Sequence, residues 1–139
     1  MLDIKFIVEN TEFVKDGLQK KGYTQEDINI DDLIALHKSV NKLKTSTQAL
    51  AEEKNRLSNS IKSASPEDRP SIIAKSKEIG EQLKNEQEQL VQEQEKFDNI
   101  MWRTPNLPCP ESPVAPDHSG NVVIKKYGEP TINLTAAKI

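Results

Sequence analysis

The sequence predicts a mainly α-helical protein, in which a long antiparallel two-helix coiled-coil arm stands on a small base of short helices and an extended C-terminal segment. Hydrophobic residues make up 35% and charged residues 29% of the 139 residues. A compact globular domain is more apolar, at roughly 45–50%. Two stretches with apolar residues in heptads flank the pair Ser65-Pro66. A thin, solvated helical hairpin fits this composition better than a globule does.

The N-terminal residues 1–22 are expected to form short helical segments of the base. Asn10 is a candidate N-cap and Gly22 a candidate helix stop. One apolar face between them is formed by Phe13, Val14 and Leu18. Residues 23–30 then read as a linker.

The first arm helix is expected over residues 31–62. Its start is marked by Asp31 and Asp32, because negative charge is favourable at a helix N-terminus. Residues then recur at spacings that alternate between three and four, which is the a/d pattern of a coiled coil. This seam, meaning the line of a and d residues, consists of Leu33, Leu36, Val40, Leu43, Thr47, Leu50, Lys54, Leu57 and Ile61.

A second arm helix is expected over residues 66/70–101, antiparallel to the first. Ser65 and Pro66 suit N-cap and N1, but Pro70 is harder to place inside a helix, so the continuous helix is predicted to begin near Pro70. Gln87 and Gln94 are expected near the contact line. The other seam residues are Ile72 or Ile73, Ser76, Ile79, Leu83, Leu90, Phe97 and Met101. At ~1.5 Å per residue the arm extends roughly 45 Å.

The chain changes character after Trp102, where proline, serine and asparagine predict a loop. Residues 122–127 read as a short strand stopped by Gly128 and Pro130, and this returning segment is expected to pack near residues 1–22. The path of residues 131–139 has no clear signal. The pattern predicts two parts: residues 1–104, with the N-terminal helices and the arm, and residues 105–139, with the proline-rich exit and the strand.

Positive charge gathers around the bend although the net charge of the chain is −3. Six basic and two acidic residues lie between Lys54 and Lys77, whereas seven acidic and two basic residues lie between Glu78 and Asp98. A basic tip on an extended arm is typical of a polyanion binder. Ordinary surface lysines on a coiled coil are the other interpretation. The candidate RNA-binding residues are Lys42, Lys54, Arg56, Lys62, Arg69, Lys75 and Lys77.

Two of these candidates, Lys42 and Arg56, are two heptads apart and are expected to face away from the seam. No aromatic residue lies near the bend, so RNA contacts there would go to the backbone and shape rather than to splayed bases.

Signatures of catalysis and of metal binding are missing from the sequence. It contains no glycine-rich phosphate loop, no GxSxG motif and no Cys/His spacing typical of a metal site. The single cysteine, Cys109, cannot form an internal disulfide, and no apolar run is long enough to span a membrane. These features predict a cytoplasmic chain that is not itself an enzyme and that holds no cofactor. A structural coiled-coil module that binds a protein partner remains an alternative.

Several segments together resemble the N-terminal tRNA-binding domain of bacterial-type seryl-tRNA synthetase. They are the opening "MLDIKFIVENTEFVKDGLQKKG", the first arm helix with its E-x-N-x-L-S element at Glu53, Asn55, Leu57 and Ser58, and the second-helix start "SPEDRPSIIAKSKEIGEQL". The exit segments "TPNLPCPESPV" and "NVVIKKYGEP" follow in the same order as in the family. Val114 and Ala115 depart from the family, which usually has a small glycine turn there.

The resemblance implies an arm that grips the long variable arm and the elbow of a serine tRNA and positions it for a class II catalytic domain. That domain is not in this sequence. A whole enzyme of this family is a homodimer that uses ATP and Mg²⁺ to join serine to its tRNA. The resemblance places the dimer contacts mainly in the catalytic domain, so this chain is expected to be monomeric.

Overall fold

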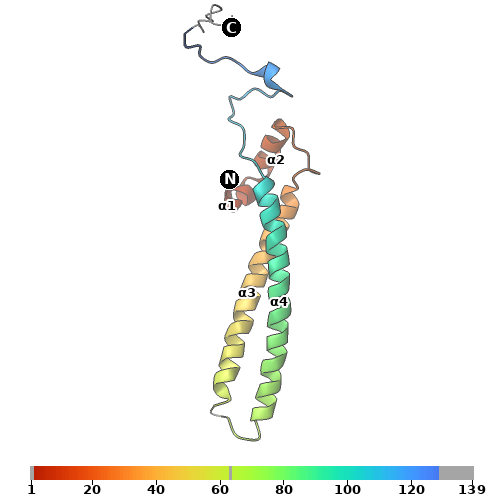
Figure 1. Ribbon diagram of the computed structural model, residues 1–139, viewed down its shortest axis with the longest axis vertical. Helices are drawn as coiled ribbons and strands as arrows, with labels where there is room; N and C mark the ends of the chain where they lie inside the picture. The colour runs from red at the N-terminus through yellow and green to blue at the C-terminus, as the bar shows by residue number, and fades with distance from the viewer. Residues whose placement is uncertain (1, 63, 129–139) are drawn as a thin grey trace, which may run out of the picture. The chain divides into compact units, whose positions relative to one another are not determined.

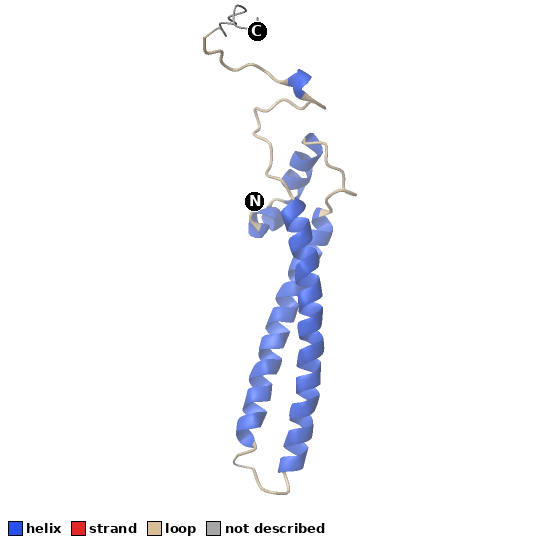
Figure 2. Ribbon diagram, in the orientation of Figure 1, coloured by secondary structure: helices blue, strands red, loops and turns tan. Residues whose placement is uncertain are grey.

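The computed structural model describes residues 2–62 and 64–128, and these residues are mainly helical (Figure 2). The chain divides into two compact units, Met1–Leu107 and Pro108–Ile139. The first unit contains α1 (Ile4–Glu9), α2 (Thr11–Lys20), α3 (Ile30–Ser60) and α4 (Arg69–Arg103). In the second, the described residues 108–128 contain the short 3-10 helix His118–Gly120.

The arm is formed by α3 and α4, which run side by side in opposite directions and meet at the bend of residues 61–68 (Figure 1). The predicted two-helix arm is therefore confirmed. Along α3 the seam residues Leu33, Val40 and Thr47 are buried, whereas Lys54 is exposed. Burial on the seam is thus strongest in the half of the arm that is nearest the base.

The start of α3 is fixed by a side chain that the sequence analysis did not single out. Asn29 is the N-cap, and its Oδ1 accepts hydrogen bonds from the backbone N–H groups of Asp31 and Asp32 at 3.1 and 3.2 Å. Such a cap satisfies N–H groups that have no partner within the helix. The helix consequently begins at Ile30, one residue before the expected position.

Residues 66–68 form a turn that is separate from the continuous helix, as the position of Pro70 indicates. Ser65 Oγ accepts from the Asp68 N–H at 3.3 Å and donates to Asp68 Oδ2 at 2.7 Å. Continuous helix begins at Arg69, with Pro70 in its first turn, where a missing N–H costs no hydrogen bond.

The base is held together by one apolar cluster drawn from all four helices and from the linker between α2 and α3. Its buried residues are Ile7, Val14, Leu18, Ile28, Ile30, Leu33 and Met101. Gly17 also lies in this packing, because a Cβ added there would lie 2.7 Å from Leu107 Cδ2. Arg103 Nη2 donates to the backbone oxygen of Asp27 at 2.9 Å and ties the end of α4 to the linker before α3. The root of the arm and the base therefore share one core.

Two residues near α2 differ in how well they match their expected roles. Gly22 has φ +82°, a conformation that L side chains rarely adopt, and it follows the last turn of α2 as a helix stop should. Asn10 occupies the N-cap position of α2 but makes no side-chain cap bond to it. Its Nδ2 donates instead to the backbone oxygen of Phe6 at 3.1 Å, so its side chain caps the end of α1.

The strand expected over residues 122–127 is wrong, because the described residues contain no strand. An isolated β segment gains stability only when neighbouring strands take up its backbone hydrogen bonds. Leu107 packs against the core of the base. The expected packing of residues 122–127 near residues 1–22 stays a prediction. Pro130 and residues 131–139 lie outside the described residues.

Acid is expected to loosen the linker between α2 and α3 through Asp27. Its carboxylate accepts from the Thr24 N–H and Oγ1 at 2.8 and 2.7 Å, and these hydrogen bonds lower the pKa of Asp27 from its ordinary value of 3.8. A lowered pKa adds stability above the ordinary value, and that stability is lost as the pH falls through the folded value. We expect Asp27→Asn to reduce the drop in unfolding temperature between pH 6 and pH 3. An unchanged drop would contradict this role.

Candidate nucleic-acid interface

Grooves run between α3 and α4 on both flanks of the seam. We name the two that lie along the middle and outer arm, where outer means nearer the bend. The inner groove has a volume of about 280 Å³ and is lined by Ser39, Lys42, Leu43, Ser46, Glu86, Gln89 and Glu93. The outer groove has a volume of about 570 Å³ and is lined by Lys54, Ile61, Ile73, Ser76, Lys77, Gly80, Glu81 and Lys84.

The two grooves lie on opposite flanks of the hairpin. At about 100° per residue, Lys77, Gly80 and Lys84 project to one side of the α4 seam, and Gln89 and Glu93 project to the other. Their charge also differs, because three lysines accompany one glutamate in the outer groove and two glutamates accompany one lysine in the inner groove. The arm therefore presents a basic flank near the bend and an acidic flank near its middle.

Lys54 is the α3 residue that forms the outer groove. Its side chain is exposed and crosses Gly80, with Cε and Nζ each 3.7 Å from the position a Cβ would take there. Long lysine side chains commonly lay their methylene stem on a surface and keep the ammonium in water. Lys54 thus keeps the seam register of a coiled coil while its charge remains available to a partner.

The acidic inner groove contains two residues that the sequence analysis did not identify. Glu86 Oε2 and Glu93 Oε2 are buried without a hydrogen-bond partner. Gln87, expected on the contact line, is exposed, and Gln94 is half-buried. If the alternating spacing of three and four is continued from Leu83, it reaches positions 86, 90, 93 and 97. The heptad pattern could therefore have identified Glu86 and Glu93 as seam residues.

Arg56 is engaged within its own helix. Its Nε and Nη2 donate to the Glu53 carboxylate at 2.8 and 2.6 Å, and this hydrogen bonding lowers the pKa of Glu53 and raises that of Arg56. Both groups remain charged near neutral pH, but Glu53 offsets the charge of Arg56. Arg56 is therefore a weaker anion ligand than its charge alone indicates.

The remaining predicted residues are spread around the outer arm. Lys42 was expected to face away from the seam. It is exposed, but it lines the inner groove together with Glu86 and Glu93. Arg69 Nε donates to the backbone oxygen of Ala64 at 3.3 Å and helps to hold the bend. Lys62 and Lys75 are exposed. Of the seven candidates, the structure brings only Lys54 and Lys77 into one groove, and it adds Lys84.

Across residues 2–62 and 64–128, no group of three or more His, Cys, Asp or Glu side chains is placed to hold a metal ion. In the same residues no helix is long and apolar enough to cross a membrane.

Comparison with known protein families matches residues 1–108 to the seryl-tRNA synthetase N-terminal domain. The chain belongs to this family. The match includes the base, the whole arm and the bend, so both grooves are features of a seryl-tRNA synthetase N-terminal domain.

Similar proteins agree with this assignment. The chain is 35% identical to the serine–tRNA ligase of Deinococcus radiodurans over 93% of its own length and 30% of that protein. It is 34% identical to the serine–tRNA ligase of Dechloromonas aromatica, over 95% of its length and 31% of that protein. A crystal structure of seryl-tRNA synthetase from Pyrococcus horikoshii complexed with ATP superposes with a TM-score of 0.76 at 31% identity, covering 92% of this chain and 29% of that one. The chain thus spans about three tenths of the length of these relatives.

Proposed function

We propose that this chain is the tRNA-binding arm of a serine–tRNA ligase. The arm grips the long variable arm and the elbow of a serine tRNA by shape and phosphate contacts. The single observation that supports this most is the long two-helix arm, with a basic groove near its free end, in a chain of the seryl-tRNA synthetase N-terminal domain family.

The composition of the arm favours backbone contacts over base reading. Neither Phe, Trp nor Tyr occurs between Tyr23 and Phe97, so the outer arm has no ring on which an unstacked base could stack. Lysines supply flexible point charges that suit phosphate groups. A double-stranded RNA arm, recognised by its shape and its phosphates, is the ligand that matches these side chains.

The catalytic steps belong, in this proposal, to the rest of a longer enzyme. The relatives are serine–tRNA ligases of which this chain matches only a part. Serine activation with ATP and Mg²⁺, the homodimer contacts and a cytoplasmic location are therefore proposed for the whole enzyme. The chain itself is proposed to bind RNA as a monomer without catalysing a reaction. The candidate residues Lys42, Lys54, Arg56, Lys62, Arg69, Lys75 and Lys77 remain proposals as tRNA contacts.

The test compares two RNAs on the 139-residue chain. We expect fluorescence anisotropy to show binding of serine tRNA, and removal of its long variable arm to weaken binding at least tenfold, or ~1.4 kcal/mol. Equal affinity for the two RNAs would contradict the proposed grip on the variable arm. A chain that binds neither RNA and forms a stable dimer in light scattering would support the alternative, a coiled-coil module for protein interaction.

A further inference from the structure

We propose that the outer groove is the part of the arm that holds the RNA backbone, with Lys54, Lys77 and Lys84 as its phosphate ligands. This inference rests on the proposed function and assigns it to one flank of the hairpin. Lys84 lies in the stretch of α4 that is acidic in sequence, but in the structure it lines one groove together with Lys77 of the same helix and Lys54 of α3.

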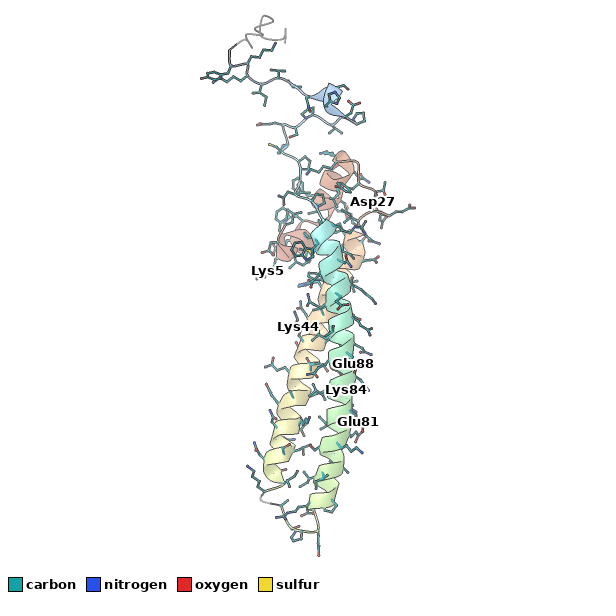
Figure 3. All side chains as sticks on the ribbon, in the orientation of Figure 1. Lys5, Asp27, Lys44, Glu81, Lys84 and Glu88 are labelled. Atoms are coloured by element: carbon teal, nitrogen blue, oxygen red, sulfur yellow. The ribbon has the colours of Figure 1, made fainter. Side chains whose placement is uncertain are left out.

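The three ammonium groups are little engaged by the protein. Among the ion pairs of the described residues none includes Lys54 or Lys77, and Lys84 approaches Glu88 only at 3.9 Å, with both side chains mostly exposed. Exposed pairs of this kind contribute little stability. Figure 3 shows Lys84 between Glu81 and Glu88 along α4. By contrast, Arg56 is held by Glu53 at 2.6 Å.

The surface between the lysines suits a sugar-phosphate backbone. The Lys54 stem crosses Gly80, where a Cβ would lie in ordinary van der Waals contact with it at 3.7 Å. Ile61 and Ile73 also line the groove, and Ile73 is 54% exposed. These side chains offer an apolar surface for ribose beside the charges for phosphate. The inner groove lacks this combination, because Glu86 and Glu93 would repel phosphates there.

The experiment removes three charges either from the outer groove or from elsewhere on the arm. One variant carries Lys54→Gln, Lys77→Gln and Lys84→Gln, which retain long polar side chains at all three positions. Its matched control carries Lys38→Gln, Lys44→Gln and Lys96→Gln, three exposed arm lysines that lie outside the outer groove, are not among the proposed tRNA contacts, and whose loss changes the net charge equally. Circular dichroism and thermal unfolding establish that each variant is folded. A further variant carries only Lys77→Gln and Lys84→Gln. It leaves the seam residue Lys54 unchanged, so any loss of affinity cannot come from altered helix pairing at that position.

Binding of serine tRNA is then measured over a range of salt concentrations. Each phosphate contact contributes about −0.7 to −0.9 to the slope of log affinity against log salt. We expect the outer-groove variant to lose at least tenfold in affinity and to have a slope shallower by about 2 to 3. The control should stay within about threefold of the parent, and the double variant should fall between them.

The outcomes separate this inference from the proposed function. If the unmodified chain prefers serine tRNA with its variable arm but both triple variants lose equal affinity, the function stands and the outer-groove assignment is wrong. An outer-groove variant with unchanged affinity and slope would overturn the assignment as well. If the unmodified chain shows no preference for the variable arm, the proposed function itself fails.

Discussion

Ile7→Ala is expected to lower the free energy of unfolding by about 2–5 kcal/mol, the usual range for truncating a buried isoleucine. Ile7 is 0% exposed and is the buried residue of the six-residue helix α1. Removing its side chain leaves a cavity in the cluster that also contains Leu33 and Met101, the roots of the two arm helices. Chemical denaturation followed by circular dichroism measures the change.

A matched control for this substitution is Ile73→Ala. Ile73 is also helical but is 54% exposed, so the same truncation removes little buried surface. We expect a change below about 1 kcal/mol, typical of a surface site. Similar losses for the two variants would show that the base does not contribute more than the outer arm to the stability of the chain.

Replacing both Glu86 and Glu93 with Leu is expected to stabilise the arm by about 1–3 kcal/mol. Each glutamate buries one carboxylate oxygen without a hydrogen bond, and an unsatisfied buried acceptor costs about 1–3 kcal/mol. Leucine at these positions would continue the apolar seam between Leu83, Leu90 and Phe97. The gain in the free energy of unfolding is measured as a higher midpoint of denaturant unfolding, with an unchanged dependence of that free energy on denaturant concentration.

Two further variants isolate the cause of that gain. Glu86→Gln with Glu93→Gln removes the charge but keeps the shape, and it is expected to give a smaller gain. Glu95→Leu places the same apolar side chain at an exposed position of α4 and should change stability little. A double leucine variant that is less stable than the parent would show that the carboxylates contribute favourable contacts, with Lys42 of the inner groove as the first candidate.

Much of the arm could be predicted because coiled-coil pairing depends on a periodicity that is visible in the sequence. The heptads from Leu33 to Ile61 fixed α3 to within two residues at either end. Pro70 marked the true start of α4, because proline is tolerated in a first turn and not in a helix interior. Gly22 was identifiable for a similar reason, since a positive φ favours glycine.

The features that sequence reasoning missed depend on contacts between distant segments. Residues 122–127 have strand-like composition, but a strand also needs a pairing partner, which composition cannot supply. The outer groove joins Lys54 to Lys77 and Lys84 across two helices, so the linear charge count assigned Lys84 to an acidic region. Arg56 counted as available charge until the structure placed Glu53 against it. Glu86 and Glu93 were overlooked because glutamates on a charged helix are usually solvent-facing.

The pairing of α3 and α4 through one repeating seam makes the reach of the arm adjustable in steps. Inserting one heptad into each helix at facing positions would preserve every a/d contact and leave both the base and the bend unchanged. The bend would simply move outward by about 10 Å per inserted heptad pair. An insertion in only one helix would instead put the two seams out of register. The hairpin can therefore act as a molecular ruler, whose length is set independently of the cluster that anchors it.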